Sequence, residues 1–190
     1  LTRVLPTERL LFSGQVVCLG TFAWEVGDPS FAGGEPSTSH CIVFSRTPVW
    51  IQHEGSARYV ADATRVTLHN RGRAYRRWRI DGRGDRCNWL AFSEEAIAAV
   101  VRRWDPAHID RAAGAPFRFQ QGPAPPAVYL RQRRLFERLH QRSIDRLAVE
   151  EEALAISHEI AACIYEGDAV RTPRIGRDRR REFDAVYEVR

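Results

Sequence analysis

The sequence predicts an α+β fold that is mainly β, in which an antiparallel barrel or sandwich is followed by a helical hairpin. Residues 10–92 contain short apolar or alternating runs separated by turns rich in Gly and Pro, which is typical of such sheets. From residue 93 onward the spacing of apolar residues becomes that of helices. The 190 residues suit one compact domain with an appendage.

Seven segments of the first half have the composition of strands. They are QVVCLGTFAW, CIVFS, PVWIQH, RYVAD, RVTLHN, AYRRWRI and CNWLAFS. The stretches between them include EGSA, NRGR and DGRGD, whose Gly, Asn and Asp residues favour turns, and Asp85 is expected to be one of these turn residues. Residues 27–39, the longest connection, are rich in Gly, Pro and Ser and are expected to form a loop.

A first helix is predicted over residues 93–104. Ser93 can cap its N-terminus, and the Asp105-Pro106 pair ends it. Three apolar residues share one face of this helix: Ile97, Val101 and Trp104. Residues 106–125 contain GAP and GPAPP and are expected to be an irregular connector.

Two further helices are predicted over residues 126–168. Residues 126–143 hold five Arg and one Glu, net +4, whereas residues 144–168 hold seven acidic residues and one Arg, net −6. Opposite charges favour pairing of the two helices as an antiparallel hairpin. The hairpin is either a cap on the barrel or a dimerisation element, since each helix carries more apolar surface than one partner needs. The candidate dimerisation residues are Leu135, Phe136, Leu139, Leu154 and Ile160.

The composition excludes several classes of protein. No run of 18 apolar residues is present, so no transmembrane helix is expected. The four Cys residues show no CxxC spacing, which favours reduced thiols in a cytoplasmic protein over a zinc ribbon. Of the net charge of +5, residues 171–190 carry +3, from seven Arg and four acidic residues. The remaining +2 is sparse for a direct nucleic-acid binder.

Four phrases, VWIQHEG, NRGRAY, GDRCNW and YLRQRRLFERL, resemble the N-terminal sensor domain of bacterial AraC-type transcription regulators. The resemblance covers most of residues 8–168. It implies a cupin-like double-stranded β-helix that binds a small effector, a helical pair that forms a homodimer, and a separate helix-turn-helix domain that binds DNA. The implied domains are a barrel with its first flanking helix (1–105), a connector (106–125), a dimerisation hairpin (126–168), and a linker entering a DNA-binding domain that this chain lacks (169–190).

A metal-dependent cupin needs a pair of His residues, a Glu, and a further His after a Gly turn. Here Tyr75 follows the turn NRGRAY where that His is expected, and WIQHEG offers His53 alone. The resemblance therefore implies no metal, no other cofactor and no enzymatic activity. Scattered His and Cys residues could still bind a soft metal if the strands bring them together. A metal-dependent cupin enzyme that acts on a small metabolite is the alternative.

The expected effector pocket follows from the resemblance and from the alternation of side chains along strands. Its predicted lining consists of Trp50, Gln52, Tyr75, Arg77, Cys87 and Trp89. Aromatic walls with a few polar groups are usual in small-ligand sites. Alternatively, Trp50 and Trp89 belong to the core and Arg77 is solvated, and a one-residue shift of register would invert every choice.

The function expected from the sequence is small-molecule sensing and homodimerisation. DNA is contacted only through the absent helix-turn-helix domain, so the chain alone should show little affinity for DNA. No membrane partner is expected.

Overall fold

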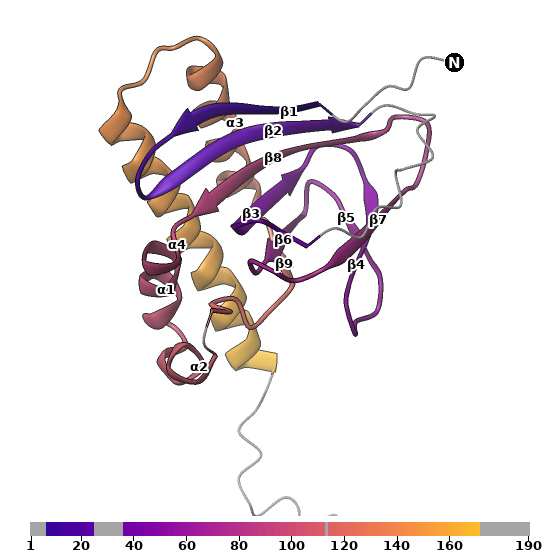
Figure 1. The fold of residues 1–190 in the computed structure, drawn as a ribbon, viewed down its shortest axis with the longest axis vertical. Coiled ribbons are helices and arrows are strands. Elements are labelled where there is room, and N and C mark those ends of the chain that lie inside the picture. Colours follow the sequence, from indigo (N-terminus) through magenta and orange to yellow (C-terminus); the bar gives the residue numbers. More distant parts are fainter. Residues whose placement is uncertain (1–6, 25–35, 113, 172–190) are drawn as a thin grey trace, which may run out of the picture.

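The computed structural model describes residues 7–24, 36–112 and 114–171. These residues form two antiparallel sheets (Figure 1). The larger has the order β1 (Thr7–Ser13), β2 (Val17–Trp24), β8 (Asp85–Phe92), β3 (His40–Ser45), β6 (Arg65–His69) and β9 (Gln121–Pro123). The smaller has the order β5 (Tyr59–Ala61), β4 (Val49–His53) and β7 (Tyr75–Arg79).

The chain alternates between the two sheets, because β3, β6 and β8 lie in the larger one while β4, β5 and β7 lie in the smaller one. An isolated bridge between Pro36 and Ala74 adds a further contact beside β7. This strand order is that of a double-stranded β-helix, the jelly roll used by cupins. The predicted α+β fold class, mainly β, is therefore confirmed.

Four helices complete the described part of the chain: α1 (Glu94–Arg102), α2 (Pro106–Arg111), α3 (Pro126–His140) and α4 (Arg146–Arg171). The Ser93 hydroxyl accepts a hydrogen bond from the Ala96 amide, so Ser93 caps α1 as predicted. The stretch expected to be an irregular connector contains α2 and β9. Asp105 caps α2 by accepting from the His108 amide, and β9 pairs with β6 at the edge of the larger sheet.

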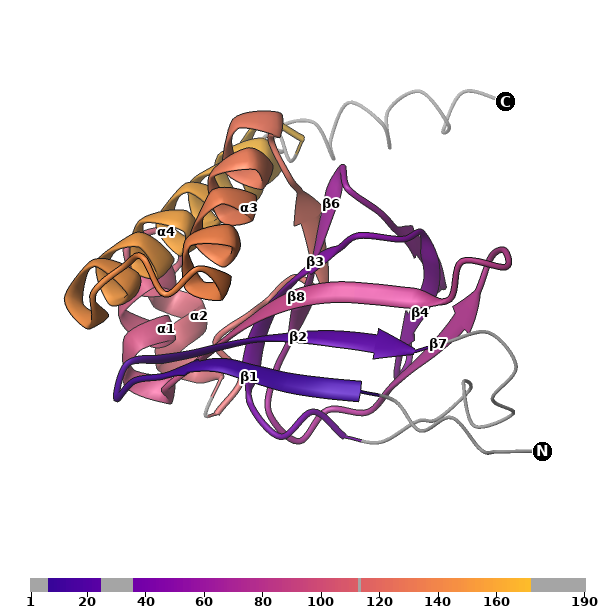
Figure 2. The same ribbon diagram turned by 90° about the horizontal axis from the view of Figure 1, so that it is seen from above.

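Helices α3 and α4 form the predicted hairpin, and Figure 2 shows them side by side. Arg131 on α3 joins them through ion pairs with Glu152, at 2.6 Å, and with Glu159. The turn between the helices includes Arg142, whose φ of 54° lies in the left-handed region. None of the helices in the described ranges is long and apolar enough to cross a membrane.

The main hydrophobic core lies between the larger sheet and the helices. Ile42, Phe44 and Leu90 of the sheet belong to it together with Phe136 and Ile156 of the hairpin. A second, smaller cluster lies between the two sheets and contains Trp24, Val49, Ile51, Tyr59 and Ala61. The helices are thus part of the fold's principal core, on the side of the larger sheet away from β4 and β7 (Figures 1 and 2).

This packing corrects most of the predicted dimerisation surface. Leu135, Phe136 and Ile160 are only 1–2% exposed because their side chains fill the core within the subunit. Leu139 and Leu154 are partly buried against the same core. Among the described side chains of the hairpin, the large apolar ones that are exposed are Leu130 and Leu147, at 56% and 64%.

Candidate functional site in the barrel

A group of polar and aromatic side chains lies between the two sheets. It comes from β4, β6 and β7 and from the adjoining end of β8. Its members are His53, His69, Tyr75, Arg77, Asp85 and Cys87. We call this set the interior polar cluster.

Arg77 is the centre of the cluster. Its Nη1 donates to Asp85 Oδ2 at 2.7 Å, and the two side chains are 15% and 3% exposed. Its Nη2 donates to the Tyr75 hydroxyl, and the guanidinium carbon lies 4.4 Å from the centroid of the Phe22 ring. Burial acts to lower the pKa of Arg77, but Tyr75 and Asp85 outweigh it and raise that pKa above its ordinary value. The guanidinium is therefore charged and held in a fixed position.

Two histidines lie beside this ion pair. His53 Nε2 and His69 Nδ1 are 3.1 Å apart, and both side chains are buried. The Tyr75 ring lies against His69, with centroids 4.0 Å apart. Burial lowers the pKa of His53 to about 4 and lowers the pKa of His69 as well. Both imidazoles are therefore neutral at pH 7, so one of the two facing nitrogens donates to the other.

The cluster does not have the arrangement of a metal site. No group of three or more His, Cys, Asp or Glu side chains among the described residues is placed to hold a metal ion. The facing nitrogens of His53 and His69 are joined to each other. Two imidazole nitrogens alone are fewer ligands than a tetrahedral or octahedral site needs.

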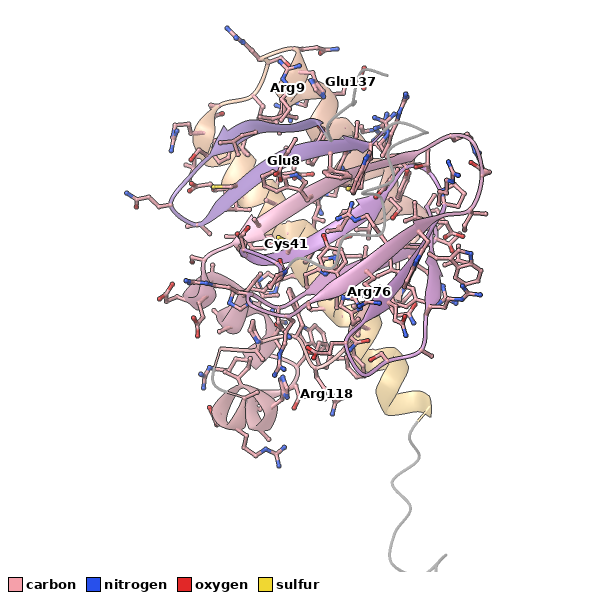
Figure 3. All side chains as sticks on the ribbon, turned by 45° about the vertical axis from the view of Figure 1, so that its right-hand side comes forward. Glu8, Arg9, Cys41, Arg76, Arg118 and Glu137 are labelled. Atoms are coloured by element: carbon pink, nitrogen blue, oxygen red, sulfur yellow. The ribbon has the colours of Figure 1, made fainter. Side chains whose placement is uncertain are left out.

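The cysteines near the cluster are protonated thiols. Burial raises the pKa of Cys41 to about 12 and raises that of Cys87 further. Cys41 lies on β3 of the larger sheet and is labelled in Figure 3. Neither Cys has the lowered pKa that a nucleophilic thiolate needs.

Trp89 forms part of the wall on the larger sheet. Its indole ring covers Gly20 of β2, where an added Cβ would lie 2.2 Å from Trp89 Cζ2. Only a residue without a side chain fits beneath this ring. The indole Nε1 is buried without a hydrogen-bond partner, which leaves a donor that a ligand could use.

The structure places four of the six predicted pocket residues around the cluster and two elsewhere. Tyr75, Arg77 and Cys87 belong to the cluster, and Trp89 lies on the same face of β8 as Cys87, two residues further along the strand. That these four bind a ligand stays a prediction.

The assignment of Trp50 and Gln52 to the pocket is wrong. On β4 the buried side chains are Val49, Ile51 and His53, so the alternate residues face outward. Arg58 stacks on the Trp50 ring at 4.6 Å, and Gln52 Nε2 donates to the Ser56 carbonyl at 2.9 Å. The face of β4 with Val49, Ile51 and His53 lies between the sheets, and the face with Trp50 and Gln52 does not.

Sequence reasoning missed His53, His69 and Asp85 as members of the site. His53 pairs directly with Tyr75 across β4 and β7. Choosing the other face of β4 as the inner one would therefore have placed His53 beside Tyr75, a predicted pocket residue. The turn motif GRGD suggests a turn residue at Asp85, but Asp85 begins β8 and is 2% exposed. Its period-two spacing from Cys87 was the available signal.

No family model matches the sequence, and no curated protein sequence matches it. Among solved structures, the AraC-like transcriptional activator CuxR is similar, with a TM-score of 0.51 and 11% identity over 83% of this chain and 54% of that chain. The cupin domain of Schizosaccharomyces pombe Cnp3 has a TM-score of 0.41 and 13% identity, over 47% and 62% of the two chains. An RmlC-like cupin with a double-stranded β-helix from Methanocaldococcus jannaschii has a TM-score of 0.37 and 8% identity, over 48% and 85%.

At these identities the likeness concerns the fold. The chain contains a cupin domain, which the strand order of its two sheets defines. The match to CuxR extends over 83% of the chain, which is more than the barrel alone and therefore includes helices. The chain spans about half the length of CuxR.

Proposed function

We propose that the chain is the effector-sensing and dimerising part of an AraC-type transcription regulator and is not an enzyme. The single observation that carries the proposal is the similarity to CuxR over barrel and helices together. The interior polar cluster supports it, since a fixed charged Arg77, neutral imidazoles and aromatic walls can orient a small polar molecule.

In this proposal the effector acts on the arrangement of two subunits. The helices share their core with the larger sheet, so a ligand that shifts the strands also shifts the surface that the hairpin presents. A ligand changes the balance between two arrangements only by its difference in affinity for them. DNA is bound by a helix-turn-helix domain outside the described residues. The linker expected over residues 169–190 lies almost entirely outside them as well.

The homodimer is proposed to form through the exposed side of the hairpin, around Leu130 and Leu147. Sedimentation at micromolar concentration tests this. The double variant Leu130→Glu/Leu147→Glu should be monomeric, whereas Leu10→Glu, at an equally exposed position on β1, should remain dimeric. A monomeric unaltered chain, or a double variant that still dimerises, would contradict this interface.

The sensing role is tested by fusing the chain to a DNA-binding domain that binds its operator only as a dimer. A small molecule that raises the melting temperature of the chain should also change reporter expression from the fusion. Binding without any change in expression would overturn the switch. Metal analysis of the purified chain separates this proposal from a metal-dependent cupin enzyme, because one equivalent of bound iron or zinc would favour the enzyme.

A further inference from the structure

The barrel contains a local excess of positive charge. Residues 50–86 hold nine Arg and four acidic residues, a net charge of +5. This equals the net charge of the whole chain, so the remaining residues are neutral on balance. The region forms the smaller sheet together with β6 and the start of β8. The net charge of the whole chain does not reveal this local excess of arginine.

Several of these arginines are available to bind an anion. Arg77 is buried and pairs with Asp85, and Arg83 pairs with Asp81. In contrast, Arg58, Arg76 and Arg79 are exposed and form no ion pair with another described residue. Exposed guanidinium groups without a carboxylate partner are suited to phosphate binding.

A row of apolar side chains crosses the outer face of the smaller sheet. Trp50 on the central strand pairs with Val60 on one side and with Trp78 on the other. The strand register turns all three outward, because Ile51 and Tyr59 are buried on the inner face. Each member of the row is partly exposed. Packing in a hydrophobic core therefore does not explain why two tryptophans lie on the solvent face of this three-stranded sheet.

Arginines flank this row. Arg58 lies over the Trp50 ring, 4.6 Å from its centroid, and Arg76 lies beside Trp78, two residues before it on the same face of β7. Figure 3 shows the position of Arg76 on the smaller sheet. Two planar rings and two guanidinium groups thus lie on one face of the sheet. We call Trp50, Arg58, Arg76 and Trp78 the basic aromatic face.

The charge of this face argues against a second copy of the chain as its partner. A symmetric dimer would bring each arginine of one copy close to the arginines of the other, and like charges at an interface are unfavourable. Duplex DNA offers phosphates, but its bases are stacked inside and give the tryptophan rings no partner. Single-stranded nucleic acid offers phosphates and accessible base faces together.

We propose that the basic aromatic face binds single-stranded nucleic acid. Bases stack on Trp50 and Trp78, and the neighbouring phosphates pair with Arg58 and Arg76. Because adjacent strands lie about 4.8 Å apart, the two rings can take neighbouring bases of one strand. Every base has a ring face that can stack on a tryptophan, so the binding is tolerant of sequence. This inference is independent of the proposed sensor function. It replaces the expectation, drawn from the net charge, that the chain alone has little affinity for nucleic acid.

Fluorescence anisotropy with labelled twelve-nucleotide oligouridine and oligothymidine, at 50 mM and 200 mM salt, tests the proposal. Both strands should bind, and a twelve-base-pair duplex should bind at least tenfold more weakly. Affinity should fall as salt increases, with a slope lowered by about 0.7 for each phosphate contact that is removed. The comparison of RNA with DNA shows which backbone the face prefers.

Matched variants assign the binding to this face. Trp50→Leu and Trp78→Leu should each weaken binding of the single strands about tenfold, because one stacked base is lost. Arg58→Ala/Arg76→Ala should reduce both affinity and salt slope. The control Arg134→Ala/Arg138→Ala removes two exposed arginines of α3 and should change neither.

Four results would overturn the proposal. The first is the absence of single-strand binding at 50 mM salt. The second is equal affinity for single strands and duplex, and the third is unchanged affinity in both tryptophan variants, since either shows general attraction to polyanions. The fourth is equal competition by polyglutamate, which would identify the face as a surface for acidic peptides. None of these results bears on the dimer or effector experiments, so the two proposals fail separately.

Discussion

Arg77 is a charged side chain held between two sheets, and its partner determines how the molecule responds to its loss. Arg77→Ala leaves the buried carboxylate of Asp85 without its cation. Such a loss lowers the free energy of unfolding by about 3–5 kcal/mol. Urea denaturation measures it. The double variant Arg77→Met/Asp85→Leu should recover most of the stability, because no unpaired charge remains.

The exposed pair Arg83–Asp81 is the matched control for this experiment, since its side chains are 64% and 37% exposed. Arg83→Ala should leave the denaturation midpoint within experimental error because water replaces the lost partner. If Arg77→Ala is no more destabilising than Arg83→Ala, the buried ion pair does not contribute to stability in the way the geometry indicates.

The histidine pair makes the stability sensitive to acid. An unfolded histidine titrates near pH 6.5, whereas burial lowers the pKa of folded His53 to about 4. Between these values the unfolded chain binds a proton that the folded chain does not. Stability should therefore be constant with respect to this group above pH 6.5 and fall as the pH decreases from 6.5 toward 4. Urea denaturation at half-unit pH intervals measures the decline.

His53→Gln tests the assignment, because glutamine keeps a polar side chain but does not titrate. Its stability should decline less steeply between pH 6.5 and 4 than that of the unaltered chain. His140→Gln, at an exposed position on α3, is the control and should follow the unaltered curve. Equal slopes for all three proteins would show that His53 does not carry the acid sensitivity.

Strand β4 shows what the sequence could and could not determine about an element. Its position and length follow from the run VWIQH between two turns. Its orientation does not, because both faces hold residues that suit an interior: Val49 and Ile51 on one, Trp50 and Gln52 on the other. The opposing elements make the choice, since Val49 and Ile51 pack with Trp24 of the larger sheet in the cluster that fills the space between the sheets. That contact is invisible in a local pattern.

For helix α3 the sequence shows that one face is buried but does not show what covers it. The sequence correctly predicts a helix with apolar surface to bury, but Leu135 and Phe136 pack within the subunit and not against a second one. Leu135 lies inside the subunit at 2% exposure, whereas Leu130 is 56% exposed. Periodicity shows that a helix has a buried face and does not show whether its own chain or another buries it.

The corrected position of Leu135 leads to a prediction for the element. Leu135→Ala should lower the free energy of unfolding by about 2–5 kcal/mol, because it opens a cavity in the core. The dimer should persist in sedimentation at concentrations where the variant is folded. Leu10→Ala, at an exposed position on β1 outside the proposed dimer interface, is the control and should have little effect on unfolding. A Leu135 variant that is fully stable but monomeric would restore the original assignment to the dimer interface.

At the scale of the whole molecule, the sequence predicts a barrel followed by a hairpin that either caps the barrel or mediates dimerisation, and the structure packs the hairpin on the larger sheet. The β-rich half and the helical half are visible in composition because local periodicity encodes each. The packing of the two halves against each other is not visible in composition. It depends on pairings between distant strands, such as β2 with β8, and on helices that pack over β3 and β8. The interior polar cluster likewise assembles from distant parts of the chain, since His53, His69 and Asp85 follow one another at intervals of 16 residues.

A shared core predicts that barrel and hairpin unfold together. Ile156 of α4 is 0% exposed and lies in the cluster that contains Phe44 and Leu90 of the sheet. Urea unfolding followed by helical circular dichroism and by tryptophan fluorescence should give coincident curves, as expected for one cooperative unit. The fluorescence reports mainly on the barrel, because Trp24, Trp50, Trp78 and Trp89 all lie on its strands.

Ile156→Ala makes this test sharper. It should lower the free energy of unfolding by about 2–5 kcal/mol in both signals equally, because one core serves both halves. Leu10→Ala, at a 56% exposed position on β1, should move neither curve appreciably. A helical signal lost at lower urea than the fluorescence signal would mean that the hairpin is an independent element docked on the barrel. An effector in the barrel could then reach the hairpin only through a surface contact, and the proposed coupling through the core would fail.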